Sequence, residues 1–284
     1  MRCSSARRGF NHFHELYRSA QTQTGWAAFQ YTTEEGGNVK LAELQSATHE
    51  LDERIYAQEF QAKFENLTAG KAYFAFDRAR NVRPLEYNPK LPIFWALDFN
   101  VNPVCSVIGQ RVGNHVHILD ELVLPDSNTW AACEEFLART EPWLTYQPLQ
   151  VYLYGDSTGA SRDSTSSRTD WQIVEQCFKR YPERYHPLQR VPSAQPRVKD
   201  RIYSVNGMLK NQAGERRLLI DPKCKGLAED FEQVVWKTDP HGNSLSEVDK
   251  SNKHRTHLSD ALGYMIHFEH AMLPKSGERS VYIA

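Results

Sequence analysis

Three aspartates stand at positions where a fold can hold a carboxylate rigidly. Asp98 ends the apolar run IFWAL, which lies between two prolines and is typical of a strand buried in a sheet. Asp156 ends a second strand-like run, in VYLYGDSTG, and Asp260 falls in the first turn of a predicted helix, in HLSDALGY. Carboxylate oxygens are the ligands that Mg²⁺ and Mn²⁺ prefer. These residues are therefore candidate metal ligands.

Each aspartate taken singly also fits a structural role. Asp98 and Asp156 suit turns, in which an aspartate bonds its own backbone, and the helix dipole favours an acid at Asp260 whatever its function. The combination favours chemistry, because His257 stands three residues before Asp260 and Gly155 permits close approach of a ligand. Three carboxylates suffice for two cations about 4 Å apart that cleave a phosphodiester. We expect the three to converge, and their mutual repulsion to raise at least one pKa.

Glu121 is a fourth candidate, in the strand-like run HILDELVL. Asp120 beside it must point to the opposite face of the same strand. Glu121 is either an auxiliary acid of the site or a charge at the end of an edge strand.

The elements that must position these residues alternate in type. Three strands are expected at Ile93 to Phe99, Val104 to Gln110 and His115 to Leu124, with short turns that indicate an antiparallel meander. Strands near 150–154 and 217–220 then alternate with helices near 130–137, 171–181, 198–209 and 224–235, and a last helix begins near Leu258. This order predicts a mixed sheet flanked by helices, an α/β fold of the ribonuclease-H-like type.

The first part of the chain lacks a core of its own. It combines a short helix within residues 4–20, a strand-like run at Trp26 to Thr33 and a helix over residues 40–64 with an imperfect apolar stripe. We expect residues 1–68 to be the end of a preceding domain plus a linker, and residues 69–284 to form the principal domain. The Ser- and Thr-rich stretch Ser157 to Arg168 is expected to be a mobile loop.

Composition favours a soluble protein of a reducing compartment. The 284 residues carry a net charge of −1 and 40% hydrophobic residues, enough for one substantial core. The five cysteines are scattered without a CxxC pair, which argues against a disulfide framework and a zinc site. No signal peptide or membrane-spanning run is recognisable, and the expected location is the cytoplasm.

The positive charge is concentrated between Ser157 and Arg217, a segment with twelve Lys or Arg residues and only six Asp or Glu residues. Such a segment suits a phosphate backbone, although a solvated surface with mixed charges explains it equally well. The candidates for backbone contacts are Arg190, Arg197, Lys199 and Arg201.

The motifs ALDF, YGDSTG, VKDRIYSVNGML and HLSDALGY, in this order, resemble the nuclease domain of the DNA-packaging terminase large subunit of tailed bacteriophages, over residues 70 to 284. Upstream, SSARRGFNHFHELY and LDERIYAQEFQAKFE are similar to the end of that family's ATPase region. The resemblance implies that Asp98, Asp156 and Asp260 are metal-binding and catalytic, with Glu121 and His257 as auxiliary residues. It also implies two Mg²⁺ or Mn²⁺ ions, double-stranded viral DNA as substrate, and the portal protein and small terminase subunit as partners.

The expected function is thus a metal-dependent endonuclease that cuts concatemeric viral DNA at the start and end of packaging, in the host cytoplasm and at the procapsid portal. No GxxxxGK[ST] phosphate loop occurs, so no ATPase activity is expected of this chain, and the usual Thr-Pro near the start reads Ala6-Arg7. Two alternatives remain open: a transposase or resolvase of the same fold, and an inactive prophage remnant that binds DNA or portal.

Overall fold

The computed structural model describes residues 12–65, 67, 70–99, 102–144, 147–157, 168–239, 244–252 and 255–270. Its centre is a six-stranded mixed sheet with the strand order β5-β4-β1-β2-β3-β6. The strands are β1 (Ile93–Asp98), β2 (Val104–Val112), β3 (His115–Leu124), β4 (Leu149–Gly155), β5 (Tyr185–Gln189) and β6 (Leu218–Ile220). As expected, β1, β2 and β3 form an antiparallel meander, and β4 returns parallel to β1. The α/β class predicted from the sequence, a mixed sheet flanked by helices, is confirmed.

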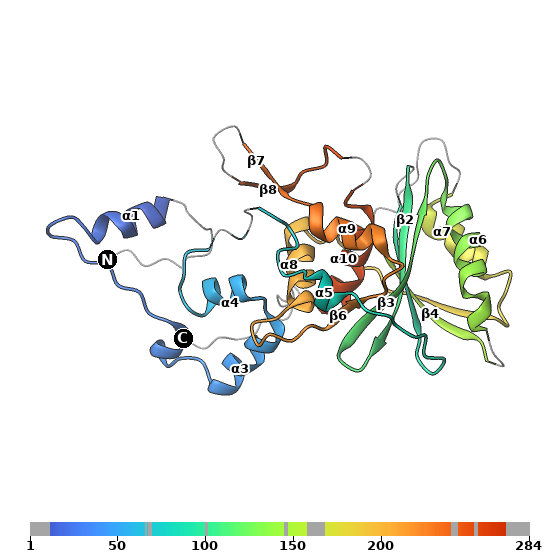
Figure 1. Ribbon diagram of the computed structural model, residues 1–284, viewed down its shortest axis with the longest axis horizontal. Coiled ribbons are helices and arrows are strands. Elements are labelled where there is room, and N and C mark those ends of the chain that lie inside the picture. The colour runs from blue at the N-terminus through green and yellow to red at the C-terminus, as the bar shows by residue number, and fades with distance from the viewer. Residues whose placement is uncertain are drawn as a thin grey trace.

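Helices cover both faces of this sheet (Figure 1). One face carries α6 (Thr129–Thr140) and α7 (Asp170–Phe178), and the other carries α8 (Val198–Leu209), α9 (Lys225–Gln233) and α10 (His257–Glu269). The remaining elements are α1 (His12–Ala20), α2 (Thr33–Gly36), α3 (Leu41–Glu50), α4 (Glu53–Glu59), α5 (Arg78–Asn81), the 3₁₀ turn Glu141–Trp143, and the hairpin of β7 (Trp236–Thr238) and β8 (Ser244–Val248).

Alternation along β1 assigns its residues to two cores. Ile93, Trp95 and Leu97 pack towards α6 and α7, whereas Phe94 and Ala96 pack towards α8, α9 and α10. Asp98 continues the second series by strand parity, so its carboxylate faces the α10 side.

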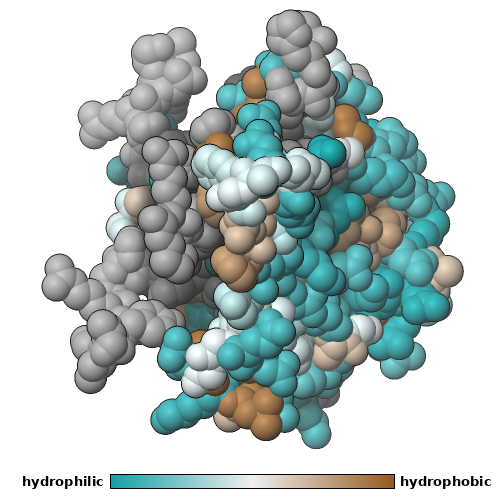
Figure 2. Space-filling model, turned by 90° about the vertical axis from the view of Figure 1, so that its left-hand side faces the viewer, coloured by the Kyte–Doolittle hydropathy of each residue, from teal (hydrophilic) through white to brown (hydrophobic). Residues whose placement is uncertain are grey.

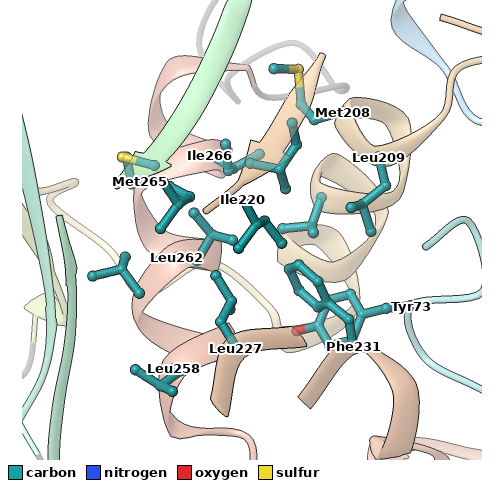
Figure 3. Close-up of a cluster of buried hydrophobic side chains, with 14 of the residues drawn as sticks. Tyr73, Met208, Leu209, Ile220, Leu227, Phe231, Leu258, Leu262, Met265 and Ile266 are labelled. Atoms are coloured by element: carbon teal, nitrogen blue, oxygen red, sulfur yellow. The ribbon is translucent and has the colours of Figure 1, made fainter. Parts of the chain in front are cut away.

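The core on the α10 side joins three helices to the sheet. Leu258, Leu262, Met265 and Ile266 of α10 meet Met208 and Leu209 of α8, Leu227 and Phe231 of α9, and Ile220 of β6 (Figure 3). These apolar residues therefore form the buried face of α10, the last helix expected from the sequence.

The N-terminal helices lie beyond α8, away from the sheet (Figure 1). Their small core of Ala47, Leu51 and Ile55 packs against Tyr203 of α8. Polar contacts add to it: Gln212 N donates to Leu51 O at 2.7 Å, and Lys210 pairs with Glu53 at 3.1 Å. From this end the surface is mostly hydrophilic with separate hydrophobic patches (Figure 2).

Two local predictions for this region are wrong. Residues 26–32 form no strand, and Trp26, Phe29 and Tyr31 are 60%, 71% and 68% exposed, because no sheet edge lies beside them. The single helix expected over residues 40–64 is two helices, since Asp52 accepts hydrogen bonds from the backbone N–H of Arg54 and Ile55 and starts α4 afresh.

Elsewhere the sequence patterns missed β5, β7 and β8. β5 is an edge strand whose residues after Tyr185 are exposed, so it lacks apolar alternation. The expected loop at 157–168 lies largely outside the described residues, as does the start of the chain up to residue 11. Within the described part, no helix has the length and apolar character needed to cross a bilayer.

Candidate carboxylate site

Asp98 lies at the end of β1 and is nearly buried, with its carboxylate held by the first residue of α10. His257 Nδ1 is hydrogen-bonded to Asp98 Oδ2 at 3.1 Å. The pairing of Leu97 with Gly155 in the parallel register of β1 and β4 brings the ends of the two strands to the same edge of the sheet. Asp156 follows directly, so the first two predicted site residues are neighbours in space.

Asp156 is fixed from both sides. Its carbonyl oxygen accepts a hydrogen bond from Trp171 Nε1 at 3.0 Å, and its carboxylate accepts one from the hydroxyl of Tyr264, in α10, at 3.4 Å. Gly155 is required here, because a Cβ at this position would lie 2.8 Å from the carbonyl oxygen of Leu97. The glycine thus lets the two strands approach, and the close approach of a ligand here stays a prediction.

Asp260 lies one turn into α10, where Arg201 of α8 reaches it. Arg201 Nη2 lies 3.0 Å from Asp260 Oδ1, and Lys250, just after β8, places Nζ 3.7 Å from Oδ2. Burial raises the pKa of Asp260; Arg201 counteracts this, and the nearby Asp98 carboxylate raises the pKa further. A raised pKa at one of the three aspartates was expected, although burial rather than repulsion is its main cause.

The start of α10 is anchored by a buried carboxylate of α9. Asp230 accepts a hydrogen bond from the backbone N–H of Ser259 at 3.1 Å. Thr256, just before the helix, has φ of 78°, a left-handed conformation that is costly for a β-branched residue. Burial raises the pKa of Asp230 to about 6. Hydrogen bonds from the backbone N–H of Ser259 and Thr256, and the charge of Arg255, lower the pKa in part. Asp230 therefore helps to hold the strained turn that sets His257 and Asp260.

Solved structures of large terminases share this fold. The large terminase of a thermophilic bacteriophage, in complex with ATP-γ-S, superposes with a TM-score of 0.62 at 16% identity, over 92% of this chain and 60% of that one. The ADP complex of the same terminase gives the same values. The chain has the fold of a large terminase. It spans about 60% of the length of these structures.

Isolated nuclease domains give looser superpositions. The P22 large terminase nuclease domain matches at 12% identity with a TM-score of 0.46, over 72% of this chain and 93% of that one. Neither a family model nor a curated protein matches the sequence. The terminase likeness therefore concerns the fold, and the chemistry of the site depends on the residues of this chain.

The carboxylate of Glu121, the fourth candidate, is hydrogen-bonded to the start of α9. Its two carboxylate oxygens accept hydrogen bonds from the backbone N–H of Gly226 and Leu227, each at 2.8 Å. Glu121 thus caps the first turn of α9 from a neighbouring strand. Its partner Asp120 faces the other side of the sheet and pairs with Arg139 of α6 at 3.2 Å. The auxiliary role expected of Glu121 stays a prediction, with both oxygens already used.

Two of the four basic residues expected to contact DNA are paired within this chain. Arg201 is 4% exposed and pairs with Asp260. Arg190 is partly exposed, pairs with Glu269 at 2.8 Å and lies over the ring of Tyr152 at 3.6 Å. The phosphate contacts expected of these two residues stay a prediction.

The other two, Arg197 and Lys199, do line the surface. They stand at the start of α8 in a groove of about 920 Å³ whose other wall is the β7–β8 hairpin. That wall adds Lys237 and Lys250, which the sequence analysis had not singled out. Lys250 also contacts Asp260, so one residue of this groove touches one of the candidate carboxylates. Clustering of lysines from distant segments leaves no local pattern in the sequence.

The donors present suit hard divalent cations, since the site offers three carboxylates and no thiolate. In the described residues, no three His, Cys, Asp or Glu side chains are arranged closely enough to hold one ion. Each carboxylate is instead paired with a side chain of this chain. His257 is hydrogen-bonded to Asp98, Tyr264 donates a hydrogen bond to Asp156, and Arg201 and Lys250 form ion pairs with Asp260. Lys250 has a 63% exposed side chain and is free to withdraw, whereas Arg201 is buried and fixed.

Proposed function

We propose that this chain is the nuclease portion of a terminase large subunit and hydrolyses phosphodiester bonds of double-stranded DNA. The observation that carries the proposal is that one helix, α10, is linked to all three aspartates: it carries Asp260, its His257 bonds Asp98, and its Tyr264 bonds Asp156. Burial and a strained helix start maintain this cluster at a cost to stability, which is typical of functional sites. The terminase fold supports the same reading.

Asp98, Asp156 and Asp260 would hold two Mg²⁺ or Mn²⁺ ions. Two cations bound at such a site activate the attacking water and neutralise charge on the leaving oxygen. Residues of the protein would hold these ligands in place. Arg201 keeps Asp260 in position. The imidazole of His257, once released from Asp98, would orient a water molecule or contact a phosphate oxygen. Lys250 balances the carboxylate charge until the cations arrive.

The DNA backbone would follow the groove beside α8. Arg197, Lys199, Lys237 and Lys250 supply positive charge from both walls, offset in part by Glu247 and Asp249. Side chains of this kind contact phosphates and carry no sequence information, which suits cutting at positions not defined by sequence.

The biological setting extends the proposal. The enzyme would cut concatemeric viral DNA at initiation and termination of packaging, with the portal protein and the small terminase subunit as partners, in the bacterial cytoplasm and at the procapsid. Residues 69–284 would form the nuclease domain, and residues 1–68 the end of the ATPase region and the linker. ATP hydrolysis is not assigned to this chain, which spans about 60% of the thermophilic-phage terminase structures.

Supercoiled plasmid provides the test. The protein should convert it to nicked and linear forms with Mn²⁺, and a chelator or the substitution Asp156→Asn should stop the conversion. Asp156→Asn keeps an acceptor for Tyr264 and the backbone contact to Trp171, so it should fold normally. Plasmid binding without Mn²⁺-dependent cleavage would support an inactive binding module, and selective cutting of four-way junctions would support a resolvase.

A further inference from the structure

Arg201 is the most buried basic side chain near the carboxylates, and it makes three contacts with α10. Its guanidinium pairs with Asp260 Oδ1 at 3.0 Å, and Nη1 donates to the backbone oxygen of Asp260 at 3.3 Å. It also lies over the ring of Tyr264, with Cζ 4.1 Å from the ring centroid. One planar group therefore restrains both the side chain of Asp260 and the ring one turn further along α10.

Tyr264 continues the contact to the second carboxylate. Its hydroxyl donates to Asp156 Oδ2 at 3.4 Å and accepts a hydrogen bond from Gln195 Nε2 at 2.8 Å. Arg201, Tyr264 and Asp156 thus form a continuous series from α8 through α10 to the end of β4. The two carboxylates joined in this way stand on different elements, and local backbone geometry does not fix their separation.

The side chain of Arg201 is enclosed between α8 and α10. Arg201 is 4% exposed. Gly263 of α10 lies against its stem, and a Cβ at this position would be in ordinary van der Waals contact, 3.4 Å from Arg201 Cβ. Close packing of this kind limits the conformations open to the buried side chain.

We propose that Arg201 is a positioning residue that sets the separation of Asp260 and Asp156 for divalent cations, acting on Asp260 directly and on Asp156 through Tyr264. The inference rests on the proposed function for its metal, and it assigns Arg201 a role other than DNA contact. A guanidinium suits this role because its planar fork pairs and stacks at the same time, which a lysine ammonium cannot do.

The substitution Arg201→Lys tests this role, because it keeps the charge that Asp260 needs while removing the fork and the stack. We expect Mn²⁺ affinity, measured without DNA by electron paramagnetic resonance of free Mn²⁺, to fall roughly 10- to 100-fold, the range found when residues supporting metal ligands are changed. Raising the Mn²⁺ concentration should restore part of the plasmid cleavage.

A matched control lies at the other end of α10. Arg190 also stacks on a tyrosine, Tyr152, and pairs with an acid of α10, Glu269, but it does not contact the carboxylate cluster. Arg190→Lys should therefore leave Mn²⁺ affinity unchanged, even where it lowers the melting temperature. Tyr264→Phe, which keeps the stack and removes the hydroxyl, should weaken Mn²⁺ binding less than Arg201→Lys.

The outcomes separate this inference from the proposed function. If the wild-type protein cleaves plasmid and Arg201→Lys binds Mn²⁺ with unchanged affinity, the positioning role is overturned and the nuclease stands. If the wild-type protein binds Mn²⁺ without cleaving, and Arg201→Lys weakens that binding, the positioning role holds and the nuclease is overturned. A wild-type protein that binds no Mn²⁺ overturns both, and a fall in melting temperature with unchanged Mn²⁺ affinity leaves Arg201 a structural residue.

Discussion

The two faces of the sheet are built from the same strands but in different ways. Towards α6 and α7 the interior is mainly aromatic and aliphatic: Trp95 stacks on Phe136 with 4.1 Å between ring centroids, and Phe178 and Tyr185 enclose them. Towards α8, α9 and α10 an apolar core also buries Asp98, Arg201 and Asp230. Charged groups in such an interior are costly unless they are paired. The second face thus gives up stability for a carboxylate cluster.

Because of this difference, we expect substitutions on the two faces to affect stability and activity separately. On the aromatic face, loss of a side chain should cost stability and leave the chemistry of the folded molecules intact. On the carboxylate face, removal of the charge of Asp98 should cost activity and leave stability equal or improved.

The largest effect is expected for Asp98→Asn, which removes one metal ligand and keeps the shape. Mn²⁺-dependent plasmid nicking should fall by about 10³-fold or more, as for a residue that the chemistry requires. The metal-free melting temperature should be equal or higher, because one negative charge near Asp260 is gone. Both are measured on one preparation. Nicking at the parent rate, or clear destabilisation without metal, would make Asp98 a structural turn residue.

Phe136→Ala examines the aromatic face and should cost about 3–5 kcal/mol in the free energy of unfolding, the range for a buried phenylalanine. Phe136 is fully buried and packs against three aromatic rings. Urea denaturation measures the loss, and the Mn²⁺ concentration for half-maximal nicking should not move. A shifted Mn²⁺ dependence would show that the two faces are coupled.

Asp52→Asn measures the cost of a buried carboxylate far from the site. Burial raises the pKa of Asp52 from 3.8 to about 6, and its Oδ2 has no hydrogen-bond partner. The folded state then binds more protons than the unfolded state between these pKa values, so this stabilisation is lost as the pH rises through 6. At pH 7 Asp52→Asn should be more stable, by as much as about 3 kcal/mol at 1.4 kcal/mol per pKa unit.

The same comparison gives its own control across pH. Near pH 4 the wild-type and Asp52→Asn proteins should unfold at similar urea concentrations, because the carboxyl group is then protonated when folded. A constant difference between the two proteins from pH 4 to 7 would contradict the raised pKa of Asp52.

Glu121→Gln should have the smallest effect, about 1–2 kcal/mol of stability, because an amide replaces one of two charge-assisted acceptors at the start of α9. Mn²⁺ affinity should stay at the wild-type value if Glu121 serves only as this cap. Weakened Mn²⁺ binding in folded protein would restore the auxiliary role that its strand position suggested, and would extend the carboxylate face by one residue.

The α/β class, and the positions of the three aspartates at strand ends and a helix start, could be predicted from the sequence. Strands and helices with strong apolar periodicity can be recognised from the local sequence. The structure confirms three such predictions: the strand ending at Asp98, the helix Val198–Leu209, and the start of α10 near Leu258. Where periodicity is weak, the prediction was wrong, as at Trp26 to Thr33, or absent, as for the exposed edge strand β5.

The partner that each charged residue takes depends on the tertiary structure. Arg201 and Lys199 stand two positions apart in one basic segment, yet one is buried against Asp260 and the other lines a surface groove. Glu121 caps a helix more than a hundred residues away, and Tyr264 of α10 reaches Asp156 at the end of β4. Secondary-structure propensity and periodicity depend on neighbours along the chain and could be predicted. Burial and ion pairing depend on contacts between distant segments and could not be predicted from the sequence.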